Sequence, residues 1–148
     1  MKTIFDINTR NEVINRINSL GEASTSKWGK MNIYQMIKHC TLWEEMIIGK
    51  VKCKRIFFGR LIGRIALKQS LKNETPMMQN AVTSPELIVK DLKGDIATEK
   101  AKWIALIEAH ANYSNFEFVH PFFGKMTKEQ VGYFIYKHTD HHLRQFNC

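Results

Sequence analysis

The chain has 148 residues, a length that fits one domain (residues 1–148) and can bury a sizeable core without disulfides or a structural metal. Hydrophobic residues make up 44% and charged residues 24%, with eight Gly and three Pro, a composition that excludes disordered and collagen-like proteins. Lys and Arg number 22 against 14 Asp and Glu, which leaves a net charge of +8.

The sequence shows no pattern typical of a membrane span, a signal peptide or a disulfide framework. No uncharged apolar stretch is long enough to span a membrane, and Asp6 interrupts the N-terminus before the apolar region of a signal peptide could form. Three cysteines are odd in number and widely spaced, which disfavours a disulfide framework: Cys40, Cys53 and Cys148. We therefore expect a cytoplasmic protein without a membrane span.

Two helices are predicted in the N-terminal third of the chain. The first opens at a capping box, Thr9 to Glu12, and ends at Gly21. The second has Asn32 as its N-cap and stops near Gly49. Apolar residues recur every three or four positions in both, as a buried helix face requires: Val13, Ile14, Ile17 and Leu20, then Ile33, Met36, Cys40, Trp43 and Ile47.

A long connection, residues 50–94, separates these helices from two more. We expect at most one short helix in it, or alternatively a short strand at residues 86–92 (ELIVKDL). Asp95 caps a third helix that runs to about Ala111, and residues 112–125 form a loop. A second capping box, Thr127 to Gln130, opens a fourth helix that runs to about Phe146. The sequence thus predicts an all-α four-helix bundle whose crossover makes its second and third helices run in the same direction.

The excess positive charge lies in one part of the long connection. Residues 50–72, the basic segment, hold eight Lys and Arg and no acid, with Phe57, Phe58, Leu61, Ile62 and Ile65 interleaved. Such a pattern suits a membrane surface or nucleic acid. We favour a simpler interpretation, in which these apolar residues face inward and the cations are solvated. We therefore predict no specific nucleic-acid partner, and at most salt-sensitive, sequence-independent DNA binding.

The inward stripe of the fourth helix begins apolar and ends polar: Val131, Phe134, Ile135, His138, His142 and Gln145. Imidazoles are costly to bury unpartnered, and two histidines at i and i+4 direct their rings to one point, as in helical metal sites. His39 falls on the inward side of the second helix, which should run antiparallel to the fourth. We predict that His39, His138 and His142 bind a divalent metal; the alternative is three core histidines with ordinary hydrogen bonds.

Two further residues lie near the predicted site. Gln145 either orients a ligand or a metal-bound water, or faces solvent at a frayed helix end. Trp28 precedes the second helix on the side where the histidines gather, and either lines the mouth of the site or only packs there.

We predict structural rather than metal-binding roles for the remaining histidines and for the carboxylates near the site. We interpret His141 as a helix-edge residue, His120 as a packed loop residue and His110 as an ordinary late-helix residue. We expect the Asp140 carboxylate to point outward, and we interpret Glu44 and Glu45 as surface charges.

Three imidazoles leave a coordination position open, which is the pattern of catalytic metal sites. Zn²⁺ and Ni²⁺ suit such ligands best, and Fe²⁺ and Mn²⁺ bind them with lower affinity. A hydrolase also needs a general base beside the metal-bound water, and no inward carboxylate is predicted. Lewis-acid chemistry remains, in particular the ionisation of a low-molecular-weight thiol.

Two segments, Trp28–Cys40 (WGKMNIYQMIKHC) and His120–Phe146 (HPFFGKMTKEQVGYFIYKHTDHHLRQF), resemble the DinB/YfiT superfamily, whose members are described as metalloenzymes, and most closely a small uncharacterised subfamily of it. The resemblance implies a four-helix bundle with a long connection between its second and third helices and three metal-binding histidines, here His39, His138 and His142, followed by Gln145. Many relatives read His-Arg-Gly-Gln where this chain has His-Leu-Arg-Gln, so no role passes to Arg144.

The resemblance also implies an activity, because some members of the superfamily are S-transferases or isomerases that use a small thiol. Our preferred hypothesis is a metal-binding DinB-like protein acting on a small-molecule substrate, such as a metal-dependent thiol S-transferase. A metal-dependent hydrolase and a non-enzymatic basic binding protein are the alternatives. We leave open whether the chain forms a homodimer.

Overall fold

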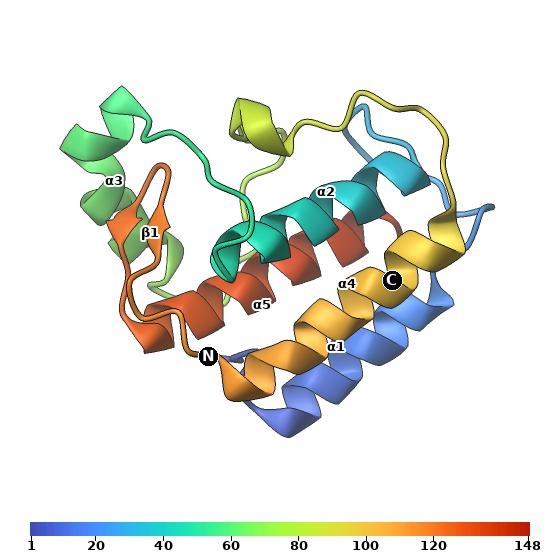
Figure 1. Ribbon diagram of the computed structural model, residues 1–148, viewed down its shortest axis with the longest axis horizontal. Coiled ribbons are helices and arrows are strands. Elements are labelled where there is room, and N and C mark those ends of the chain that lie inside the picture. The colour runs from blue at the N-terminus through green and yellow to red at the C-terminus, as the bar shows by residue number, and fades with distance from the viewer.

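The computed structural model describes residues 1–148 as a helical bundle with a small hairpin and a further helix at its periphery (Figure 1). The elements in chain order are α1 (Ile7–Ser19), α2 (Ile33–Ile47), α3 (Phe57–Ser70), η1 (Pro85–Leu87), α4 (Ile96–Ala109), η2 (His110–Asn112), β1 (Val119–His120), β2 (Gly124–Lys125) and α5 (Lys128–Gln145). The prediction of a mostly helical protein is confirmed. Helices α2 and α4 run in the same direction, antiparallel to α1 and α5 (Figure 1).

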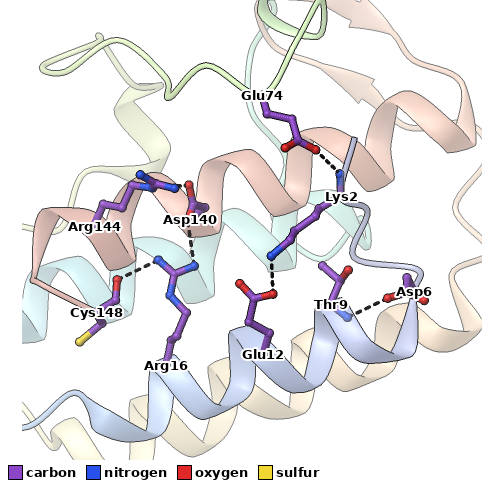
Figure 2. Close-up of polar contacts among 9 residues, drawn as sticks. All are labelled: Lys2, Asp6, Thr9, Glu12, Arg16, Glu74, Asp140, Arg144 and Cys148. Carbon is purple, nitrogen blue, oxygen red and sulfur yellow. Dashed lines mark hydrogen bonds and ion pairs between the residues drawn. The ribbon is translucent and has the colours of Figure 1, made fainter.

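Side-chain caps define where the helices begin. The predicted caps of α2 and α5 are confirmed: Asn32 pairs with Gln35, and Thr127 pairs with Gln130, in reciprocal capping boxes. The predicted capping box at Thr9 is wrong. The Asp6 carboxylate accepts a hydrogen bond from the Thr9 backbone N–H at 2.8 Å (Figure 2), so α1 begins at Ile7 and Thr9 lies in its first turn.

The long connection and the last loop are more ordered than predicted. The connection contains α3, a full helix of 14 residues, and the single-turn η1. Residues 86–92 form no strand. Instead β1 and β2 pair antiparallel inside the predicted loop, with Gly124 at φ +86° where the chain turns back. The Arg55 side chain donates to the carbonyl oxygens of His120 and Pro121 and so ties the start of α3 to this hairpin.

The predicted inward orientation of the apolar residues of the basic segment is wrong. Helix α3 buries Gly59, Gly63 and Leu67 against the rest of the protein. Its larger apolar side chains are exposed instead: Phe57, Phe58, Leu61, Ile62 and Ile65. The physical reason is that the two glycines sit directly on the backbone of the β1–β2 turn, where no side chain fits.

The core lies between α1, α2, α4 and α5. Met36 of α2, Trp103 and Ile107 of α4 and Ile135 of α5 are all fully buried. None of the helices is long and apolar enough to cross a bilayer.

The prediction that Asp140 points outward is also wrong. Figure 2 shows its carboxylate between two cations: Arg16 of α1 donates at 2.8 Å and Arg144, one turn further along α5, donates at 2.7 Å. Arg16 also donates to the carbonyl oxygen of Cys148 at 2.8 Å. Asp140 is buried because α1 covers this side of α5, and its ion pair with Arg16 joins the two helices.

Candidate metal centre

Three histidine side chains come together in the interior, His39 from α2 and His138 and His142 from α5. Their ring centroids lie 5.5 Å (His39 to His138), 5.0 Å (His39 to His142) and 4.7 Å (His138 to His142) apart. One nitrogen of each ring lies within 4.8 Å of one nitrogen of the other two, and all three residues are buried. We call this group the histidine cluster. Because its members come from neighbouring antiparallel helices, the bundle itself sets their separation.

The ring of His39 is oriented by the long connection. Its Nδ1 lies 2.9 Å from the carbonyl oxygen of Leu87 in η1. A carbonyl can only accept, so Nδ1 carries the hydrogen and Nε2 keeps its lone pair for a metal. Nothing in the sequence pointed to Leu87, since a backbone acceptor has no side-chain signature and lies 48 positions from its partner.

A similar contact orients His142. Its Nδ1–H donates to the amide oxygen of Gln145 at 2.9 Å, and the Gln145 amide nitrogen donates to the Trp28 carbonyl oxygen at 2.8 Å. Gln145 is therefore buried and held at both ends, and does not face solvent. Trp28 meets the site through its backbone, while its ring packs edge-on against His141 at 5.6 Å.

His138 is held by stacking. Its ring lies parallel to the Trp43 indole, with centroids 4.1 Å and planes 12° apart. Its Nδ1 is buried and has no hydrogen-bond partner. An unpartnered buried polar atom is costly, and the lone pairs of three converging imidazoles suit a divalent metal. The residues present therefore fit a metal ion that has three nitrogen ligands.

Burial keeps the cluster uncharged. Desolvation lowers the pKa of His39, and lowers that of His142 to about 3. The pKa of His138 is also lowered well below its usual value, first by desolvation and then by its two neighbours in the cluster. All three are thus neutral at pH 7, the form in which imidazole binds metals.

The other histidines lie outside the cluster. His141 sits at the edge of the helix, half-buried. His120 packs in the hairpin, where its Nδ1 accepts the backbone N–H groups of Phe122 and Phe123 at 3.1 and 3.2 Å. His110 is no ordinary late-helix residue, because it is fully buried and its Nε2 lies 2.7 Å from the Glu44 carboxylate.

The interpretation of Glu44 as a surface charge is wrong, since its side chain is fully buried in the core. One oxygen contacts His110 and the other lies 3.5 Å from the Thr139 hydroxyl. A signal was available: Ile37, Thr41 and Glu44 follow the three-and-four spacing of a second buried face of α2. Glu45 is less buried and pairs with Lys102 at 3.1 Å.

Fold and site together define a helical-bundle protein with a buried three-histidine group that could hold a metal ion. The family model named "Protein of unknown function (DUF1569)" matches residues 2–148, so the chain belongs to that family over almost its whole length. No curated protein and no solved structure matches it. The family description names no activity, and the resemblance to the DinB/YfiT superfamily stays a prediction.

Proposed function

We propose that this protein binds one divalent metal ion through His39, His138 and His142, and that it is a DinB-like metal-dependent enzyme acting on a small molecule. The observation that carries the proposal is the convergence of three buried, neutral imidazoles within 4.8 Å. Two of these rings are turned by hydrogen bonds from Nδ1, as is usual for metal-binding histidines. Zn²⁺ and Ni²⁺ are the preferred ions, and Fe²⁺ and Mn²⁺ the weaker ones.

The architecture supports the DinB-like part of the proposal. A long connection between α2 and α4, one ligand on α2 and an H-x-x-x-H pair with a following Gln on α5 are the features that the resemblance implies. The buried contacts of Gln145 give this following residue a specific task, the orientation of His142.

The carboxylates support Lewis-acid chemistry over hydrolysis. The prediction that no carboxylate points inward is wrong, because Glu44 and Asp140 are both buried. However, Glu44 is bonded to His110 and Thr139, and Asp140 is bonded to Arg16 and Arg144. Neither is free to act as a general base beside the histidine cluster. A bound divalent ion would lower the pKa of a small thiol, so that the thiolate forms at neutral pH.

We propose thiol transfer as the reaction. The thiolate sulfur attacks an electrophilic carbon, a sulfur–carbon bond forms, the leaving group departs with its bonding electrons, and the thiol proton goes to solvent. His39, His138 and His142 stay neutral because burial disfavours their charged forms. They stay oriented because neighbouring groups hold each ring.

Metal binding is tested on protein purified without a His-tag, treated with a chelator and titrated with Zn²⁺ and with Ni²⁺. We expect about one ion per chain and a loss of affinity of more than about 100-fold in His138→Ala. His141→Ala is the matched control, since it removes the neighbouring imidazole of the same helix and should bind normally. Absence of tight binding of any ion, or equal binding by the triple His→Ala variant, would refute the site.

Thiol transfer is tested with a panel of low-molecular-weight thiols and a chromogenic electrophile. Metal-loaded protein should accelerate conjugation, and His142→Ala should abolish the rate while keeping its helical circular dichroism. A protein that binds metal but gives no His142-dependent rate would refute thiol transfer alone, and would favour a hydrolase or a non-enzymatic binding protein.

A further inference from the structure

Helix α3 presents a large apolar surface to solvent, which we call its outer face. Five side chains form it, with exposed fractions of 70% for Phe57, 69% for Phe58, 69% for Leu61, 51% for Ile62 and 73% for Ile65. Contiguous exposed apolar surface of this kind marks an interaction site in a soluble domain. Figure 1 places α3 at one end of the molecule, beside the hairpin and outside the four-helix bundle.

The orientation of α3 is enforced by its opposite face. A Cβ atom added at Gly59 or Gly63 would overlap the carbonyl oxygen of Phe122, so only glycine allows the helix to sit on the hairpin backbone. Leu67 is the one large side chain that α3 buries. If α3 rotated about its axis to bury its outer face, bulky side chains would clash with the hairpin backbone. The outer face therefore stays exposed to solvent.

Cations border the outer face. Arg60, Arg64 and Lys68 follow one another at i, i+4 and i+8 along one flank of α3, all exposed and none in an ion pair. Beside this flank, a cleft of about 760 Å³ lies between α3 and the start of α5. Its lining includes four cations against one acid: Arg64, Lys68, Lys125 and Lys128 against Glu129.

We propose that α3 docks this protein onto an anionic lipid bilayer. In this arrangement the outer face enters the boundary between headgroups and acyl chains, and the flanking cations contact lipid phosphates, as amphipathic interfacial helices do. All five side chains of the outer face come from one helix at the periphery, which suits a helix that lies in a bilayer interface. The charge argues against a second copy of the chain, because pairing two outer faces would bring together two basic segments that contain no acid. The proposal is independent of the metal centre.

The test is co-sedimentation of the protein with vesicles of phosphatidylcholine alone and of equimolar phosphatidylcholine and phosphatidylglycerol. We expect binding to the anionic vesicles that weakens with salt, and at least about tenfold weaker binding to the neutral ones. Phe57→Ser/Ile65→Ser and Arg60→Glu/Arg64→Glu should each weaken anionic-vesicle binding by about tenfold or more. Both pairs change exposed side chains only, so circular dichroism and unfolding temperature should match the parent.

Leu92→Ser/Lys93→Glu is the matched control, because it removes an exposed apolar residue and an exposed cation on another part of the surface. It should bind vesicles like the parent. Failure of the parent to bind anionic vesicles, or equal losses in the control, would overturn the proposal. Concentration-dependent self-association that Phe57→Ser/Ile65→Ser abolishes, without vesicle binding, would assign the outer face to a second copy instead.

Discussion

The amide oxygen of Gln145 lies 2.9 Å from Nδ1 of His142 and accepts its hydrogen. This contact fixes which nitrogen of His142 is free for a metal. Gln145→Leu should therefore lower metal affinity by about 10–100-fold, the usual effect of losing a group that orients a ligand. Titration calorimetry measures the change.

A conservative variant separates orientation from packing. Gln145→Glu keeps an oxygen that can accept from His142, loses the donation to the Trp28 carbonyl and adds a buried carboxylate at this position. It should keep affinity within a few-fold of the parent while unfolding at a lower temperature. Equal affinity losses in both variants would show that the contact with Trp28, and not the orientation of His142, matters for metal binding.

Trp43 should report metal binding by its fluorescence, because its indole stacks 4.1 Å from the His138 ring. Paramagnetic Ni²⁺ should quench part of the tryptophan emission, and Trp43→Phe should remove most of that quenching. Trp103→Phe, which changes a fully buried tryptophan of α4, is the control and should leave the quenching intact. Quenching of the same size in Trp43→Phe would contradict the proposed position of the ion.

The buried pair of Glu44 and His110 should be sensitive to loss of either partner. Glu44→Ala leaves the His110 imidazole buried without its 2.7 Å contact, and should lower the free energy of unfolding by about 3–5 kcal/mol. Urea unfolding measures this change.

The double variant Glu44→Leu/His110→Leu tests the origin of that loss. It removes both polar groups and should recover much of the lost stability, because no buried polar atom of the pair then lacks a partner. If the decrease in the free energy of unfolding of the double variant equalled the sum of the decreases of the two single variants, the two side chains would not be coupled.

His120 should make stability depend on pH. Burial, and then the Arg55 guanidinium, lower its pKa in the folded protein to about 3, whereas an unfolded histidine titrates near 6.5. Above about pH 6.5 neither state holds the proton. As the pH falls from about 6.5 toward 3, the unfolded state binds it first, so the free energy of unfolding decreases in this window.

His120→Asn tests this dependence. Its amide oxygen can accept from the backbone N–H groups of Phe122 and Phe123 but does not titrate, so stability should fall less steeply between about pH 6.5 and 4. Urea unfolding at several pH values measures the slopes. An unchanged slope would show that His120 does not contribute to the acid sensitivity.

The bundle helices and the histidine stripe are predictable from the sequence, because they depend on interactions between residues close together in the chain. The predicted N-cap at Asn32 and the predicted capping box at Thr127 satisfy backbone groups within one turn, and both are confirmed. The i, i+4 spacing of His138 and His142 puts both rings on one face of α5 in any helix. At Thr9 the same rule failed because Asp6, three residues earlier, already accepts the Thr9 N–H.

Which polar groups meet and which apolar groups stay exposed depends on contacts between residues far apart in the chain. Glu44 and His110 are 66 positions apart, so neither residue reveals the other in the sequence. The orientation of α3 depends on Gly59 and Gly63 touching the Phe122 backbone, far along the chain. Helical periodicity shows that α3 has an apolar face, but it cannot show whether a neighbour covers that face. Here the backbone of α3 packs directly on the backbone of the β1–β2 turn. That contact leaves no space for a side chain, so the larger apolar side chains of α3 lie on the opposite, exposed face.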